Sequence, residues 1–174
     1  MRLTSKRILV AGIGNIFFAD DAFGCEVARR LSQRELPSDV AVVDFGIRGF
    51  DLAIALLEDY ELSILIDATP RGGAPGTLYV IEVDLNEVET ETSSLDTHAI
   101  NPLSVLALVK SMGRRRGRIL IVGCEPSPIS EDSGLSKPVA AKLDKAIELV
   151  ESLITKNLNG GVLGNEGVRA AMRF

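Results

Sequence analysis

The sequence predicts a three-layer α/β/α sandwich around a five-stranded mixed sheet. Short apolar runs bounded by glycine or aspartate alternate with longer segments whose apolar residues recur every three or four positions. This alternation is typical of strands covered by helices. The chain has 174 residues, of which 46% are apolar and 25% charged, an ordinary composition for one globular domain. We expect a single domain over residues 1–156 and a loose tail over residues 157–174, where glycines occur without a clear period.

The first half of the chain is expected to contain three strands and two helices. Each strand is a short, largely apolar run. The first contains β-branched residues, and the third is nearly all apolar, as central strands covered on both faces are. The first helix has its apolar positions four residues apart and acids in its first turn. The expected elements are a strand at 7–12, a helix at 21–36, a strand at 40–44, a helix at 50–57 and a strand at 62–67.

The second half is expected to add two strands and two helices, at 77–83 (strand), 102–112 (helix), 118–123 (strand) and from 137 to about 156 (helix). The link over residues 68–76 is too short for a parallel crossover, so the fourth strand should run antiparallel. Asn101 should cap the helix that Pro102 begins, and Ser136 should cap the last helix.

Charge and cysteine content narrow the class of protein. The net charge is −5 and the pI about 5.0, which argues against a nucleic-acid partner. Two cysteines, Cys25 and Cys124, are too few for a disulfide-stapled secreted domain. No apolar stretch reaches the roughly 20 residues that span a bilayer. We therefore expect a cytoplasmic protein that binds no membrane.

Polar side chains follow the ends of the first three strands, where sites form in open α/β sheets. Asp21 follows the first strand, Asp44 ends the second and Asp67 ends the third, while His98, the only histidine, precedes the helix at 102. If the first and third strands are neighbours, two carboxylates and one imidazole could meet, a set that suits a divalent ion. Plainer interpretations stay open: Asp20 or Asp21 caps a helix, Asp67 begins a turn, and His98 is a solvated loop residue.

Other chemistries are less well supported. Residues 12–15 (GIGN) resemble the start of a dinucleotide-binding fingerprint, but Phe17 stands where the third glycine is needed. Asp44 could still bind a ribose, so a Rossmann-like nucleotide-binding protein remains an alternative. There is no Gly-x-Ser-x-Gly segment for serine hydrolysis. Cys124 could be a nucleophile, although a buried structural thiol is the commoner case.

Taken together, the motifs resemble the hydrogenase maturation proteases. The resemblance covers roughly residues 7–155. His98 ahead of a helix is similar to the metal-binding histidine of that family. The other matching segments, in chain order, are GIGN at 12–15, DDAFG at 20–24, DFGIRG at 44–49, LIDA at 65–68, PGT at 75–77, VGCEP at 122–126 and GLS at 134–136.

The resemblance implies a fold, a site and a reaction. The fold would be phosphorylase/hydrolase-like, with strand order 2-1-3-5-4 and strand four antiparallel. The family's metal ligands would fall on Asp21, Asp67 and His98, with Asp44 a secondary candidate for positioning or proton transfer. The substrate would be a nickel–iron hydrogenase large-subunit precursor, which supplies the nickel and loses a C-terminal peptide.

Two departures concern the site itself. The first ligand is often glutamate in the family, whereas Asp21 is shorter by one methylene, and Phe45 replaces one of the paired glycines after strand two. Both indicate a subfamily with its own partner. A non-catalytic nickel sensor or chaperone that binds the precursor without cutting it remains an alternative.

Overall fold

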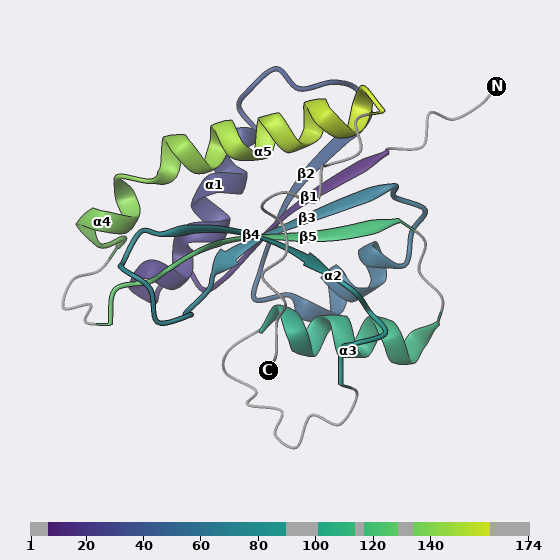
Figure 1. Ribbon diagram of the computed structural model, residues 1–174, viewed down its shortest axis with the longest axis horizontal. Coiled ribbons are helices and arrows are strands. Elements are labelled where there is room, and N and C mark those ends of the chain that lie inside the picture. The colour runs from purple at the N-terminus through teal and green to yellow at the C-terminus, as the bar shows by residue number, and fades with distance from the viewer. Residues whose placement is uncertain (1–6, 90–100, 114–116, 129–133, 161–174) are drawn as a thin grey trace.

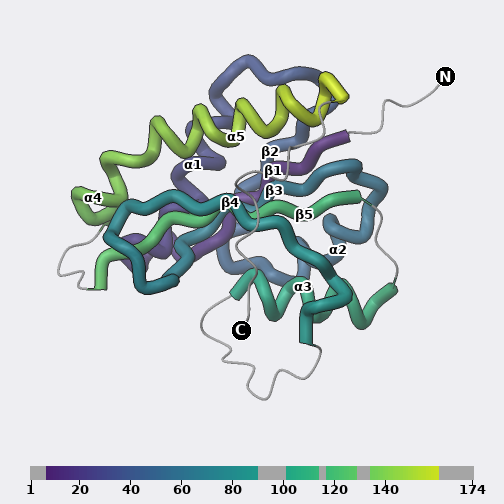
Figure 2. Tube along the Cα trace, in the orientation of Figure 1, coloured from purple at the N-terminus to yellow at the C-terminus, as the bar shows by residue number. Residues whose placement is uncertain are grey.

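The computed structural model describes residues 7–89, 101–113, 117–128 and 134–160. Its central sheet is covered by α1 and α5 on one face and by α2 and α3 on the other (Figures 1 and 2). The predicted three-layer architecture is therefore confirmed. The elements are β1 (Ile8–Ile13), the 3₁₀ helix η1 (Ala19–Ala22), α1 (Phe23–Leu31), β2 (Val40–Gly46), α2 (Gly49–Leu56), β3 (Leu62–Ala68), β4 (Leu78–Val83), α3 (Pro102–Met112), β5 (Arg118–Cys124), α4 (Lys137–Ala140) and α5 (Leu143–Leu158).

The sheet has the order β2-β1-β3-β5-β4, and β4 pairs antiparallel with β5 while the other pairs are parallel. Both the strand order and the direction of β4 were predicted correctly. β1 and β3 lie at the centre, and Gly12 pairs with Ile66 near their carboxyl ends. As a result, the loops that follow β1, β2 and β3 leave the sheet at one edge.

Each face of the sheet has its own apolar core, because side chains of successive strand residues point to opposite faces. Ile8 and Val10 of β1 belong to the core under α1 and α5. Leu9 and Ala11, which alternate with them along the strand, belong to the core between the sheet and helices α2 and α3. All six residues of β1 are buried, which explains why its sequence shows no polar alternation.

Helix α1 packs unusually close to the sheet through Gly24. A Cβ at this position would lie 2.0 Å from the carbonyl oxygen of Ile66 and 2.3 Å from that of Ile13. The missing side chain therefore lets the helix approach the backbone of β3 and β1 directly. Because η1 immediately precedes α1, the packed position of α1 also fixes where η1 lies relative to the end of β3.

The first helix differs from the one expected at 21–36. Residues 19–22 form a 3₁₀ turn, and the α-helix begins at Phe23 and ends at Leu31. Neither Asp20 nor Asp21 caps it with a side chain, so the capping interpretation of these acids is wrong. The carboxylate of Asp21 instead accepts a hydrogen bond from Asn15 in the same turn, and that of Asp20 accepts one from Ser127, which follows β5.

Two helix starts in the second half test the capping rules. Asn101 caps α3 as predicted, its side chain accepting from the amide of Leu103 at 2.9 Å. The expected helix from 137 to about 156 is instead two helices, α4 and α5, and α5 continues to Leu158. Ser136 makes no side-chain cap, because its hydroxyl donates to Asp20. Residues 161–174 of the expected tail lie outside the described residues.

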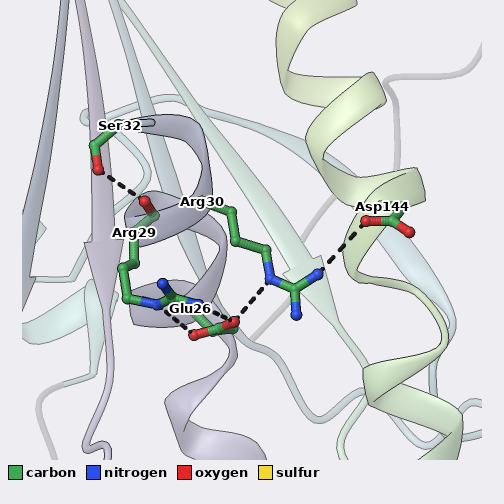
Figure 3. Close-up of polar contacts among 5 residues, drawn as sticks. All are labelled: Glu26, Arg29, Arg30, Ser32 and Asp144. Carbon is green, nitrogen blue, oxygen red and sulfur yellow. Dashed lines mark hydrogen bonds and ion pairs between the residues drawn. The ribbon is translucent and has the colours of Figure 1, made fainter. Parts of the chain in front are cut away.

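Ion pairs connect α1 with α5 at the surface (Figure 3). Glu26 accepts from Arg29 and Arg30, and Arg30 also pairs with Asp144 of α5 at 3.5 Å. The hydrogen bond from Arg29 is the main cause that lowers the pKa of Glu26 to about 2, with Arg30 adding to it. The pairs supplement the apolar contact between the two helices.

Candidate active site

Asp67 at the end of β3 is the most unusual polar residue of the described chain. Its side chain is only 5% exposed, and its Oδ1 is buried without a hydrogen-bond partner among the described residues. Burial, together with the nearby charge of Asp21, raises the pKa of Asp67 well above its usual value, and the amide of Ala68 offsets this only in part. Buried polar atoms are normally paired, so an unpaired carboxylate oxygen indicates a place for a ligand.

Asp21 is brought to Asp67 by a tight turn after β1. Its Oδ2 accepts from the amide of Asn15 at 2.7 Å, and its own amide donates to the carbonyl of Phe18 at 2.9 Å. Gly14 allows this turn: its φ is +134°, and a Cβ there would lie 1.8 Å from the carbonyl oxygen of Asp21. The expectation that Asp21 and Asp67 approach each other is therefore met through the predicted neighbourhood of β1 and β3.

Asp44 ends at the same edge, from β2. Its Oδ1 accepts from the amide of Gly46 at 2.9 Å, and the residue is exposed. It also interacts with the buried thiol of Cys25, whose pKa is raised to about 12 by burial first, then by a hydrogen bond with Asp44 and the charges of Asp44, Asp21 and Asp67. All three acids therefore disfavour the thiolate form of Cys25, and this thiol stays protonated near neutral pH.

His98 lies outside the described residues, so its predicted place in the site stays a prediction. Within the described ranges, no three His, Cys, Asp or Glu side chains are grouped so that they could hold a metal ion. Of the predicted residues, the structure places Asp21, Asp44 and Asp67 after or at the carboxyl ends of neighbouring strands, and it brings Asp21 close enough to Asp67 to raise the pKa of that carboxyl.

Sequence reasoning considered Asp20 only as a helix cap, whereas the residue is 4% exposed and its carboxylate accepts hydrogen bonds from a distant loop. Its carboxylate accepts from the amide of Ser127 at 2.8 Å, and from the amide and hydroxyl of Ser136 at 2.7 and 2.8 Å. Asp20 therefore fastens the loop after β1 to the loop after β5. Its acidic neighbour Asp21 was visible in the sequence, but partners more than 100 residues away gave no local signal.

Glu125 is a second buried acid that the sequence did not single out. It follows β5 and is 5% exposed. Its carboxylate accepts from the amides of Arg71 and Gly72 and from the hydroxyl of Tyr79, the last at 2.7 Å. These bonds hold in place the loop between β3, which carries Asp67, and β4.

Cys124 is buried, and its pKa is raised to about 11, mainly by burial and then by the charges of Asp20 and Glu125. It is therefore unsuited to act as a thiolate nucleophile, in agreement with its interpretation as a structural residue.

In the described ranges, no helix is both long and apolar enough to cross a lipid bilayer.

Asp21, Asp44 and Asp67 lie at the carboxyl ends of parallel strands, where ligand sites form in open α/β sheets, and this end of the sheet is therefore the candidate active site. Comparison with known proteins is more specific. The family model of the hydrogenase maturation proteases matches residues 25–153, and the chain belongs to this family of endopeptidases. A Methanocaldococcus jannaschii protein assigned to the same proteases is 34% identical over 158 residues, covering 88% of this chain and 100% of the relative.

Two comparisons with Escherichia coli proteins agree. The hydrogenase 2 maturation protease is 30% identical over 145 residues, which cover 83% of this chain and 88% of that protein. The solved structure of the hydrogenase maturating endopeptidase HybD superposes with a TM-score of 0.70 at 30% identity, covering 87% of this chain and 93% of the other. The fold and the enzyme class predicted from the sequence are thereby confirmed.

Proposed function

We propose that this protein is a cytoplasmic, nickel-dependent endopeptidase that removes the C-terminal extension of a nickel–iron hydrogenase large-subunit precursor. Asp21, Asp67 and His98 would contact nickel that the precursor already holds. The observation that carries this proposal is the buried Oδ1 of Asp67, which lacks a partner among the described residues and lies near Asp21. A cation brought by the substrate would relieve both the missing partner and the repulsion between the two acids.

The chemistry of these side chains supports recognition of a metal that another protein holds. Carboxylate oxygens are hard ligands, whereas nickel in the precursor would be bound by softer thiolates. Two carboxylates of this chain therefore hold the shared ion lightly and release it with the product. When bound, the ion supplies Lewis-acid polarisation of a nearby carbonyl.

The attacking group in this proposal is water. Both thiols of the chain are buried and have raised pKa values, to about 12 for Cys25 and about 11 for Cys124, so neither offers a thiolate near neutral pH. Asp44 is exposed at the same edge, where its carboxylate would orient water or accept a proton. Its role is secondary to that of Asp21 and Asp67.

The test is intact-mass spectrometry of a large-subunit precursor, nickel-loaded or nickel-free, incubated with enzyme. The wild type should remove a C-terminal peptide from the nickel-loaded form. Asp67→Asn and His98→Ala should each slow this by at least about 100-fold, beyond the effect typical of outer-shell partners of a metal site. Asp144→Asn, an exposed acid on α5, is the matched control and should cleave like the wild type.

Each alternative has its own outcome. Cleavage of nickel-free precursor at an equal rate would contradict nickel dependence. Nickel-dependent binding with no loss of mass would favour a non-catalytic nickel chaperone. Thermal stabilisation by NAD, without any effect of the precursor, would favour a nucleotide-binding protein.

A further inference from the structure

Exposed apolar side chains are concentrated beside the candidate active site. Phe17 is 84% exposed, Phe18 66% and Phe50 63%. Soluble proteins seldom gather large apolar side chains on one part of their surface unless it contacts a partner. We use the name apolar rim for these rings together with their exposed apolar neighbours: Ile16, Phe17, Phe18, Ile47, Phe50 and Ile54.

The rim is formed by two segments that leave adjacent strands. The amide of Gly14, after β1, donates to the carbonyl of Gly46, at the end of β2, at 3.1 Å. Residues 16–18 follow the first of these glycines and Ile47 follows the second. Phe50 and Ile54 are four residues apart on α2 and so share one face of that helix. The rim therefore begins at the edge where Asp21, Asp44 and Asp67 lie.

The loop that exposes the rings is held by hydrogen bonds. The amide of Phe17 donates to Oδ1 of Asn15, and the amide of Phe18 to its carbonyl, both at 3.0 Å. The amide of Asn15 in turn donates to Oδ2 of Asp21. The same turn thus presents two phenylalanines and positions a candidate metal ligand, so the exposure of the rings is built into the site.

We propose that the apolar rim binds an apolar segment of the precursor polypeptide next to the bond that is cut. This inference rests on the proposed function. Its basis is the continuity of the rim with the candidate active site: a chain that reaches Asp21 and Asp67 has to leave along a neighbouring surface, and the rim offers preformed apolar contacts there. Preformed aromatic side chains lose little conformational freedom on binding, which favours affinity.

The charges around the rim narrow the chemistry of the segment. Asp44 and Asp51 lie among its residues, and the cation between them, Arg48, pairs with Asp51 at 3.6 Å. With Asp21 close by, the local charge is negative. An acidic segment would be repelled, so the bound segment carries apolar side chains with neutral or basic neighbours.

The experiment measures affinity and turnover separately. A Phe17→Ser/Phe50→Ser double variant and the control Met112→Ser would be titrated against immobilised nickel-loaded precursor, and KM and kcat would be measured by mass spectrometry. Met112 is 41% exposed but ends α3, just before β5 begins and so towards the opposite edge of the sheet. The double variant should raise Kd and KM by at least about tenfold with a much smaller change in kcat, and the control should match the wild type.

The outcomes separate this inference from the proposed function. Normal cleavage together with an unchanged Kd in the double variant would overturn the rim and leave the protease. Rim-dependent binding without cleavage would support the rim and contradict the protease. If the wild type neither binds nor cleaves, both fall. A wild-type dimer that the double variant breaks, with precursor affinity intact, would assign the rim to self-association and overturn the inference.

Discussion

At the scale of single residues, the buried acids at the carboxyl edge of the sheet differ in whether their carboxylate oxygens have hydrogen-bond partners. Asp20 and Glu125 are buried and satisfied by amide and hydroxyl donors. Asp67 is equally buried, but one of its oxygens has no hydrogen-bond partner among the described residues and lies near the charge of Asp21. Of these three acids, Asp67 is the one with an oxygen available to bind a cation. Hydrogen bonding therefore distinguishes a candidate ligand from structural acids that are equally buried.

We expect Asp67→Asn to stabilise the protein in the absence of precursor. A neutral amide keeps the volume of the side chain but removes a buried charge and its repulsion by Asp21, which should raise the free energy of unfolding by about 1–2 kcal/mol at pH 7. Urea unfolding followed by circular dichroism measures this. Asp144→Asn should stay within about 0.5 kcal/mol of the wild type. A less stable Asp67→Asn protein would show that the charge is compensated.

At the scale of elements, the position of α1 links packing to the site. Gly24 lets α1 lie directly against β1 and β3, and η1 before it carries Asp21. On its outer side, Glu26 and Arg30 connect the helix with Asp144 of α5. The helix is therefore held on both sides, which limits the movement of the turn that precedes it.

The pH dependence of stability should report the Glu26 cluster. Arg29, and then Arg30, lower the pKa of Glu26 to about 2 from an ordinary value of 4.5, so its stabilisation is complete above pH 4.5 and is lost as the pH falls towards 2. Because the arginines are partly exposed, Glu26→Gln should lower the free energy of unfolding by only about 1 kcal/mol at pH 6. The decrease should be smaller at pH 3, where part of the stabilisation is already lost in the wild type. Urea titrations at both pH values measure this. Glu148→Gln, at an exposed position on α5, is the control. An equal loss of stability in Glu26→Gln at both pH values would refute the assignment of this pH dependence to Glu26.

At the scale of the whole molecule, the site is assembled from loops that start far apart in the chain. Asp20 fastens the loop after β1 to the residues that follow β5, and Glu125 fastens the end of β5 to the loop after β3. Asp20 is the sequence neighbour of Asp21, and the loop after β3 follows directly from the strand that carries Asp67, so each link lies next to a candidate ligand. The stability of this edge therefore depends on contacts that also hold the fold together.

Asp20→Ala should destabilise the protein by about 3 kcal/mol, because it leaves the amides of Ser127 and Ser136 without their acceptor. For a protein of this size, such a change lowers Tm by roughly 10 °C, which differential scanning calorimetry would detect. Asp84→Ala is the matched control: within the described part of the chain its carboxylate accepts local bonds, from the amide and side chain of Asn86, and its loss should cost about 1 kcal/mol or less. Equal effects of the two variants would contradict the role of Asp20 as a link between loops.

Local patterns determined the strands, the antiparallel direction of β4 and the cap at Asn101. The run at 62–67 is nearly all apolar because β3 is covered on both faces, and the short link over residues 68–76 leaves no room for a parallel crossover. The strand ends also located Asp21, Asp44 and Asp67 at one edge, since parallel neighbours bring their carboxyl ends together. These features depend on residues close in sequence or on a general rule of topology.

The tertiary structure decided the state of each side chain. Nothing near Ser136 in sequence shows that its hydroxyl donates to Asp20 instead of capping a helix. Three features depend on which segments become neighbours after folding. They are the exposure of Phe17, the oxygen of Asp67 that lacks a partner in the described ranges, and the close approach of α1 to the sheet at Gly24. Apolar periodicity is a property of a few adjacent residues, whereas burial and hydrogen-bond partners are set by atoms contributed from across the whole chain.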